Sequence, residues 1–136
     1  SHLTEIEHFM RPIMESIKAY RSQLYFLDSR TSSRSVAYNE AINSGLDSVK
    51  RDIFLDHDHN NIESIKFQFD LWLKIARDTG SAVAIGHPHP NTMKILTEQL
   101  PLIQKEFQFM PVSQLISNTK KLKDTIRPQK YLSKLE

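Results

Sequence analysis

The stretch IFLDHDH, residues Ile53 to His59, decides the expected fold because a short apolar run ends abruptly in ionisable side chains. A second stretch, AVAIGHPHP from Ala82 to Pro90, has the same order of apolar and then polar residues. Short apolar runs bounded by polar or turn residues are typical of buried strands. Each stretch therefore predicts a strand followed by a His-x-His pair. Imidazole binds divalent metals and titrates near neutral pH, which makes both pairs candidates for a metal or acid-base site.

Helical patterns separate the predicted strands. Thr4 and Glu7 have the spacing of a capping box, and apolar residues at helical spacing follow them as far as Tyr20. Pro12 lies inside this helix and is expected to kink it, because proline lacks a backbone donor. The other expected elements are strands at 24–27, 53–55, 82–85 and 107–110 and helices at about 35–44, 61–79 and 91–104, the last interrupted by Pro101.

This order of elements predicts the fold class. Asn60 or Asn61 is expected to cap the 61–79 helix, while Gly80 and Gly45 are expected to end helices. Strands that alternate with helices imply parallel pairing through right-handed crossovers, and hence an α/β fold. We therefore expect a parallel-strand (β/α) barrel-like structure. Four such units amount to about half of a closed barrel of roughly 250 residues.

The composition is that of one globular domain and excludes several kinds of site. The 136 residues are 39% hydrophobic and 25% charged, and none is cysteine, which excludes disulfides, thiolate zinc sites and cysteine nucleophiles. No stretch approaches the roughly 20 apolar residues of a membrane span, and any export signal is expected upstream of Ser1. The net charge of +2 is too small to indicate a nucleic-acid partner, and from Asn118 onward six basic residues face two acidic ones.

Polar segments follow three of the predicted strands. The carboxyl ends of parallel strands meet at one edge of a sheet, where α/β folds build their sites. Asp28 and Asp56 come directly after apolar residues, so each strand would hold its carboxylate rigidly at that edge. The three segments that we expect to converge are Asp28–Arg30, Asp56–His59 and His87–His89.

The histidines also have structural explanations. His87 and His89 could lie in a turn stabilised by prolines, with both imidazoles solvated. Gly86 is expected to let the backbone turn tightly, and His87 is nearer the strand end, so it is the better candidate. For His57 and His59 we favour a polar loop that leads into a helix cap.

Two arginines are further candidates. Arg51 could form an ion pair with Asp52 or support the site, and Arg30 could pair with a carboxylate or hold a sugar or acyl oxygen through its planar fork. Aromatic side chains at helical spacing indicate a core in preference to a sugar-binding platform, namely Phe67, Phe69 and Trp72.

Three strings carry a family resemblance. They are YFLDSRT (Tyr25–Thr31), RDIFLD (Arg51–Asp56) and AIGHPHP (Ala84–Pro90). In order and spacing they resemble the motifs of the divergent polysaccharide deacetylase family. The resemblance covers residues 1–116, which implies a C-terminal half of a deacetylase-like domain, followed by a basic tail at 117–136.

The resemblance implies a fold and a reaction. Such proteins are similar to carbohydrate esterases with a distorted (β/α) barrel, which remove N-acetyl or O-acetyl groups from polysaccharides. It implies that a divalent metal, zinc, activates the attacking water, that an aspartate acts as base, and that a histidine near the barrel's end protonates the leaving group. The implied substrate is a polysaccharide or peptidoglycan-type glycan of the cell envelope, and the implied location is periplasmic or extracytoplasmic.

Roles are carried over by position. The resemblance implies catalytic roles for His87, Asp56, Asp28 and Arg30, supporting or substrate-binding roles for Arg51 and His89, and weak metal-ligand roles for His89 and His57. The family's Asp-Asp and Asn-Asn-His-Met-Gly strings would precede Ser1, so the main metal ligands and the base are expected upstream or on a second chain. The Arg-x-Pro-x-Gly motif of classical deacetylases would fall at Asp28–Arg30, which lacks the proline and glycine.

Three alternatives remain open at this stage. The first is a non-catalytic carbohydrate-binding or scaffolding member of the same fold. The second is a metal-dependent phosphoesterase or amidohydrolase, since those folds also use His-x-His after a strand. The third, a nucleic-acid-binding tail, is disfavoured because Tyr131 is the only aromatic residue in the tail.

Overall fold

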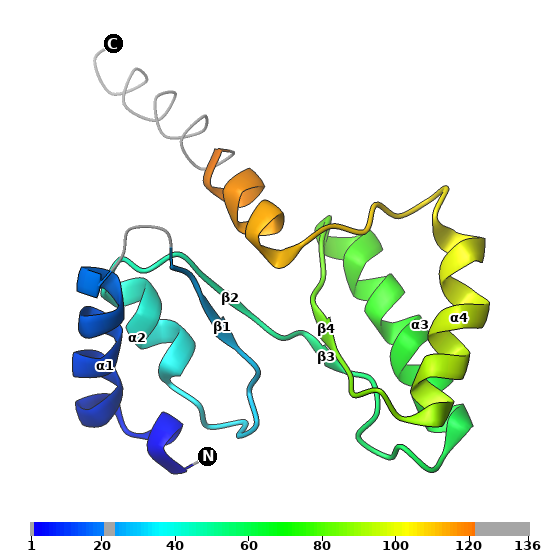
Figure 1. The fold of residues 1–136 in the computed structure, drawn as a ribbon, viewed down its shortest axis with the longest axis horizontal. Coiled ribbons are helices and arrows are strands. Elements are labelled where there is room, and N and C mark those ends of the chain that lie inside the picture. The colour runs from blue at the N-terminus through cyan, green and yellow to red at the C-terminus, as the bar shows by residue number, and fades with distance from the viewer. Residues whose placement is uncertain (1, 21–23, 122–136) are drawn as a thin grey trace.

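The structure, a computed structural model, describes residues 2–20 and 24–121. Helices and parallel strands follow one another along these residues (Figure 1). In chain order the elements are η1 (His2–Glu5), α1 (Glu7–Tyr20), β1 (Phe26–Asp28), α2 (Ala37–Asn43), β2 (Ser48–Lys50), β3 (Ile53–Phe54), α3 (Ile62–Thr79), β4 (Ala84–Ile85) and α4 (Pro90–Ile103). Residues 112–121 are also helical. Most of the expected basic tail, from 122 to 136, lies outside the described residues.

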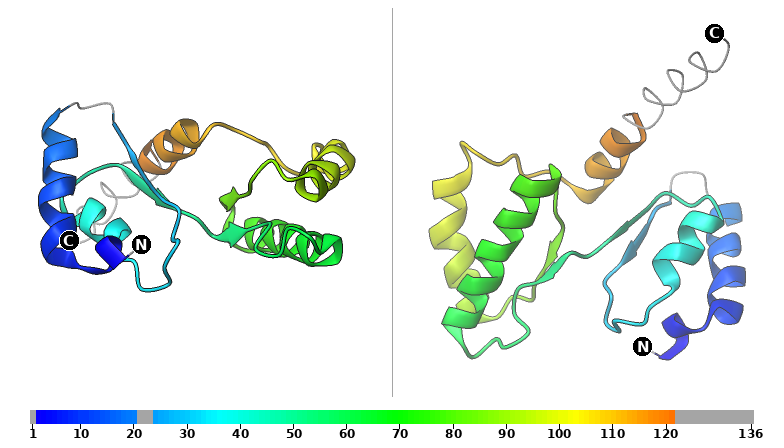
Figure 2. Two further views of the ribbon diagram at one scale, coloured as in Figure 1. Left: turned by 60° about the horizontal axis from the view of Figure 1, so that its bottom comes forward. Right: turned by 180° about the vertical axis from the view of Figure 1, so that it is seen from behind.

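The strands pair in parallel around a central stretch. β1 pairs with β2 and β3 pairs with β4, with α2 and α3 as the crossover helices. Only Arg51 and Asp52 separate β2 from β3. The Arg51 amide donates to the carbonyl of Asp28 at 2.9 Å, whereas the Asp52 amide donates to the carbonyl of Val83 at 2.8 Å. Residues 48–54 therefore bond first to the β1 side and then to the β4 side (Figures 1 and 2).

The predicted α/β class with parallel strands is confirmed. The described strands form two two-stranded sheets and do not close a barrel. The carboxyl ends of β3 and β4 are adjacent, because Phe54 lies opposite Ile85 in the parallel register. This register brings the two His-x-His segments together.

Two hydrophobic clusters hold the elements. α1 and α2 pack together at one end of the molecule, and α3 and α4 pack together at the other (Figures 1 and 2). Trp72 packs against the second cluster and donates its Nε1 hydrogen to the carbonyl of Ala82 at 3.1 Å. Phe69 is buried as expected, but Phe67 is 65% exposed, so its assignment to the core was wrong. The buried members are Met10, Met14, Ala37, Ala41 and Leu46 in the first cluster, and Ile53, Leu55, Ile65, Phe69, Leu73 and Ile95 in the second.

The ends of α3 match the sequence signals. The side chain of Asn61 accepts a hydrogen bond from the amide of Ser64 at 3.1 Å, and Gly80 ends the helix in the left-handed conformation with φ 86°. The capping box at Thr4 was wrong. Thr4 lies in η1, and α1 begins at Glu7.

Both internal prolines lie within continuous helices. α1 runs through Pro12, and α4 continues past Pro101 to Ile103, so the expected interruption at Pro101 was wrong. Packing of a helix face outweighs the loss of one backbone hydrogen bond here. Met10 and Met14 hold α1 against its cluster.

The strand assignments differ from expectation in two places. Residues 107–110 are not a strand, because among the described residues no strand pairs with them. Phe107 instead packs against the second cluster, and the ring of Phe109 lies 6.0 Å from that of Trp72. β2 was missed because Ser48–Lys50 holds a single apolar residue between polar ones. No helix in the described part of the chain is both long and apolar enough to cross a membrane.

Candidate functional site

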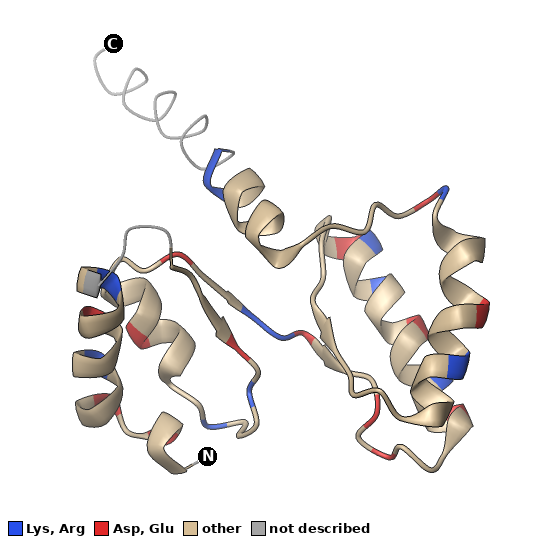
Figure 3. Ribbon diagram, in the orientation of Figure 1, with Lys and Arg blue, Asp and Glu red and all other residues tan. Residues whose placement is uncertain are grey.

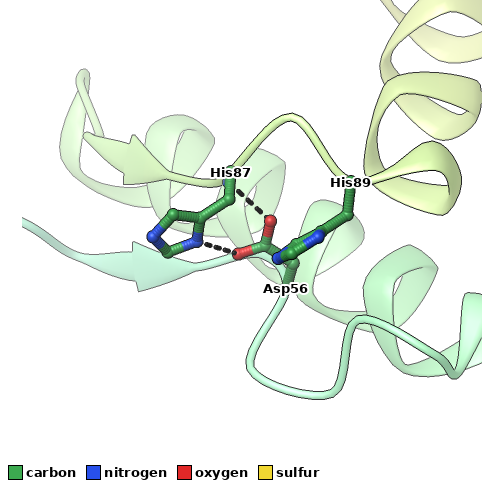
Figure 4. A group of neighbouring side chains, drawn as sticks. All are labelled: Asp56, His87 and His89. Atoms are coloured by element: carbon green, nitrogen blue, oxygen red, sulfur yellow. Dashed lines mark hydrogen bonds and ion pairs between the residues drawn. The ribbon is translucent and has the colours of Figure 1, made fainter.

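The centre of the site is a buried carboxylate at the end of β3. Asp56 follows Leu55 and is only 3% exposed. One of its oxygens, Oδ2, accepts hydrogen bonds from the backbone amide of His87 at 2.5 Å and from the Thr92 hydroxyl at 3.0 Å. The other, Oδ1, lies 3.1 Å from Nδ1 of His87 (Figure 4). β3, β4 and the first turn of α4 therefore meet at this one side chain.

These contacts keep Asp56 ionised. Burial by itself raises the pKa of a carboxyl, but the hydrogen bonds from His87 and Thr92 outweigh burial and lower the pKa of Asp56 below its ordinary value. An ionised carboxylate can only accept hydrogen bonds. Nδ1 of His87 must therefore donate to Asp56, and this contact defines the imidazole tautomer.

The geometry leaves the second nitrogen of His87 available. With the hydrogen on Nδ1, the neutral ring carries a free lone pair on Nε2, which can accept a proton and later return it. The side chain of His87 is 56% exposed, although its partner Asp56 is buried. The ring of Phe54 contacts the imidazole edge-on, with ring centres 5.5 Å apart. The arrangement suits an acid-base residue whose orientation is set by a buried carboxylate.

His89 completes a candidate metal group. Asp56, His87 and His89 each offer one ligand atom, and these atoms lie within 4.8 Å of one another. Two imidazoles and a carboxylate form a donor set that suits zinc and similar divalent metals. Figure 4 shows the three side chains converging from the ends of β3 and β4. These residues could thus hold a metal in the place where the acid-base pair lies.

The two histidines of the other pair, His57 and His59, have different surroundings. The exposed ring of His57 lies 6.2 Å from the ring of Phe54 and is outside the metal group. His59 stacks on His89 with ring centres 4.3 Å apart, and its carbonyl accepts a hydrogen bond from the Asn91 side chain. His59 therefore orders the loop around His89.

Asp28 organises a loop instead of joining this group. It is 5% exposed and ends β1. Its Oδ1 accepts from the amide of Arg30 at 2.8 Å, and its Oδ2 accepts from the Ser35 hydroxyl at 2.9 Å and the Tyr38 amide at 3.2 Å. The carboxylate thereby stabilises the segment between β1 and α2.

Arg51 contacts both the loop after β1 and the strand β3. Its Nη2 donates to the carbonyl of Arg30 at 2.7 Å, and its guanidinium lies over the ring of Phe54 at 5.0 Å. The anticipated ion pair with Asp52 is not formed. The Asp52 carboxylate accepts from the amide of Val83 at 2.8 Å.

Three features of the site differ from the sequence-based expectation. Thr92 and Phe54 were missed, because a threonine in a helix and a phenylalanine in a strand look like packing residues. Gly86 was expected to allow a tight turn, but it is not among the glycines with positive φ. A Cβ there would meet Leu55 and Thr92 at 3.4 Å, an ordinary contact distance.

The comparisons with known proteins identify the family of this chain. The family described as divergent polysaccharide deacetylase matches residues 1–116. The chain belongs to the divergent polysaccharide deacetylase family. Within that family, Escherichia coli K12 has an uncharacterized relative, YibQ, that is 35% identical over 121 residues. An uncharacterized protein of Haemophilus influenzae is 42% identical over 97 residues.

The chain corresponds to part of these longer deacetylase-family relatives. The alignments cover 89% and 71% of this chain but only 36% and 34% of the two relatives. A solved structure, the uncharacterized protein ATU2773 of Agrobacterium tumefaciens C58, has the same fold with a TM-score of 0.73 at 21% identity. That match covers 83% of this chain and 45% of the other.

Proposed function

We propose that this chain is part of a metal-dependent deacetylase that hydrolyses acetyl groups on a cell-envelope glycan, a polysaccharide or a peptidoglycan-type polymer, outside the cytoplasm. The observation that carries the proposal is the pair formed by the buried, ionised Asp56 and the exposed His87. The pair lies at the carboxyl ends of parallel strands, where α/β enzymes build their sites. Membership of the deacetylase family supplies the reaction class.

We further propose that residues 1–116 contribute about half of a deacetylase-type distorted barrel and that 117–136 form a basic tail, which begins within the helix of residues 112–121. The parallel β1–β2 and β3–β4 pairs are the units from which such barrels are built. The chain covers 45% of the solved structure that shares its fold. The remaining strands would come from the longer protein to which such a segment corresponds.

In this mechanism His87 moves the proton. As the water oxygen forms a bond to the acetyl carbon, Nε2 of His87 accepts a proton from that water. Nε2 then returns this proton to the sugar nitrogen or oxygen as the bond between that atom and the acetyl carbon breaks. Asp56 acts as a positioning residue, because it holds Nδ1, and Thr92 holds Asp56. Acetate and the free amino or hydroxyl group are the products.

A divalent metal, zinc in this proposal, would be held at His89 and Asp56 beside His87. When bound, a metal of this kind polarises the acetyl carbonyl and lowers the pKa of a bound water to about 7. His57 lies on the same loop as Asp56 and would be a weaker contributor. Asp28 and Arg30 would hold the edge of the substrate site, next to Arg51.

The test uses the full-length protein. Zinc titration by calorimetry and acetate release from acetylated chitin or peptidoglycan fragments should both give a signal. Absence of both would overturn the catalytic proposal. Glycan binding without acetate release would favour the non-catalytic carbohydrate-binding alternative, and release of phosphate from phosphate esters would favour a phosphoesterase.

A further inference from the structure

Two arginines beside the site lack a carboxylate partner. Five arginines lie within the described residues, and Arg11, Arg34 and Arg77 each form an ion pair with a glutamate. Across residues 2–20 and 24–121, neither Arg30 nor Arg51 forms an ion pair with a carboxylate. Their guanidinium groups bond to backbone carbonyls, those of Ser33 and Arg30 respectively. Charged donors therefore remain available for an external anion.

The two guanidinium groups are close enough to influence each other. Burial, and secondly the positive charge of Arg30, lower the pKa of Arg51, while Asp28 acts in the opposite direction. The Asp28 carboxylate is the nearby negative charge, but both of its oxygens accept from other donors. Arg30, Arg51 and Asp28 together carry a net charge of +1.

The loop that carries Arg30 is held in one conformation. Arg30 has a φ of 48°, in the left-handed region that is unfavourable for a non-glycine residue. Further along the loop, the Ser32 hydroxyl donates to Glu5 at 2.6 Å, and the Val36 amide donates to the carbonyl of Thr4 at 2.8 Å. The segment is thus tied to η1 at both contacts. A site on it would be formed before any ligand binds.

Arg51 lies next to the acid-base pair, and Arg30 contacts Arg51 through its backbone carbonyl. The guanidinium of Arg51 lies over the ring of Phe54, and the edge contact of that same ring with His87 joins the two groups. One phenyl ring therefore separates Arg51 from the imidazole. Figure 3 shows basic positions in the loop after β1 and at the junction of β2 and β3, each next to an acidic position.

We propose that Arg30 and Arg51 bind the carboxylate of an acidic sugar beside the acetyl group, so that the substrate is a carboxylate-bearing glycan. The planar guanidinium fork matches a planar carboxylate. One carboxylate neutralises the net charge of +1, whereas a phosphate monoester would overcompensate it. The substrate assignment rests on the proposed deacetylase function, but the binding step does not require catalysis.

The test compares ligands that differ in one charge. Full-length protein is titrated by calorimetry with a soluble peptidoglycan glycan fragment that has free carboxylates, and with the same fragment after methyl esterification. We expect the acid to bind at least about tenfold more tightly, since the methyl ester has lost the charge that strengthens hydrogen bonds from guanidinium groups. Equal affinity for acid and ester would overturn the subsite, and this comparison needs no variant.

Variants then assign the preference to residues. Arg51→Ala and Arg30→Ala should each remove most of the preference for the acid, and Arg51→Lys should retain part of it because charge remains without the fork. Arg77 lies on α3 and forms an ion pair with Glu106. Arg77→Ala is therefore the matched control and should keep the preference for the acid. A full preference in both alanine variants would contradict the assignment. Circular dichroism and thermal unfolding check the fold of each variant.

Two further measurements separate the explanations. Acetate release is followed on both fragments. If the protein binds the acidic fragment more tightly but releases no acetate, the deacetylase function is refuted and the carboxylate subsite is supported. If it releases acetate but binds the acid and the ester equally, the deacetylase function is supported and the subsite is refuted. Inorganic phosphate and acetate compete against the acidic fragment, and stronger competition by phosphate would overturn the carboxylate assignment.

Discussion

At the scale of single residues, a buried carboxylate determines how an exposed imidazole is presented. Asp56 uses both oxygens to hold His87 and Thr92, and this leaves Nε2 of His87 free to exchange a proton. The convergence of Asp56, His87 and His89 was predictable, because parallel strands place the residues that follow them at one edge. The role of Thr92 was not, since its spacing indicates only a helix.

Replacement of His87 tests the acid-base role. His87→Gln should lower acetate release by about 10²–10⁴-fold, the usual contribution of a positioned proton donor. The full-length protein should remain folded with only a small decrease in melting temperature, because the side chain is 56% exposed and a glutamine amide can still donate a hydrogen bond to Asp56. His8→Gln, an exposed histidine on α1, is the control and should retain full activity. Unchanged acetate release in His87→Gln would refute the assignment.

The lowered pKa of Asp56 predicts a pH dependence of stability. A carboxyl whose folded pKa lies below its ordinary value of 3.8 stabilises the fold above that pH, and loses this contribution as the pH falls through the folded value. Asp56→Asn should therefore cost about 1–3 kcal/mol in urea unfolding at pH 7. The difference from the unsubstituted protein should shrink below about pH 4. Asp58→Asn, at an exposed position in the same loop, should show no such difference at either pH.

At the scale of elements, local signals were reliable where they act within a few residues. The Asn61 cap and the Gly80 terminus of α3 were predicted, because each depends on one side chain or one backbone conformation. The strand expected at 107–110 was wrong, since a strand also needs a pairing partner that a local pattern cannot supply. β2 was missed for the converse reason: its pairing with β1 does not depend on an apolar run.

The cap of α3 can be tested with adjacent asparagines. Asn61→Ala removes the acceptor for the Ser64 amide and should cost about 1 kcal/mol of unfolding free energy. Asn60→Ala is the matched control, because Asn60 precedes the cap, and its cost should be close to zero. Chemical unfolding of both variants, monitored by far-UV circular dichroism, measures the difference. Equal costs would show that the cap does not stabilise α3.

At the scale of the whole molecule, each end has its own hydrophobic cluster. The cluster around Met14 lies between α1 and α2, and the cluster around Ile65 lies between α3, β3 and α4. The two clusters share no residue, and Arg51 and Asp52 join the two two-stranded sheets along the chain. The candidate acid-base pair belongs to the Ile65 side, whereas Arg30 belongs to the Met14 side. Function would therefore require both ends to be folded and correctly joined.

This division predicts local unfolding of each end. Ile65→Ala leaves a cavity at a side chain that is 1% exposed and should cost about 2–5 kcal/mol. Amide hydrogen exchange should then accelerate in α3 and α4, while exchange in α1 and α2 stays unchanged. Met14→Ala, at a fully buried side chain of the other cluster, should give the reverse pattern. Uniform acceleration across all four helices in either variant would show that the two clusters unfold as one unit.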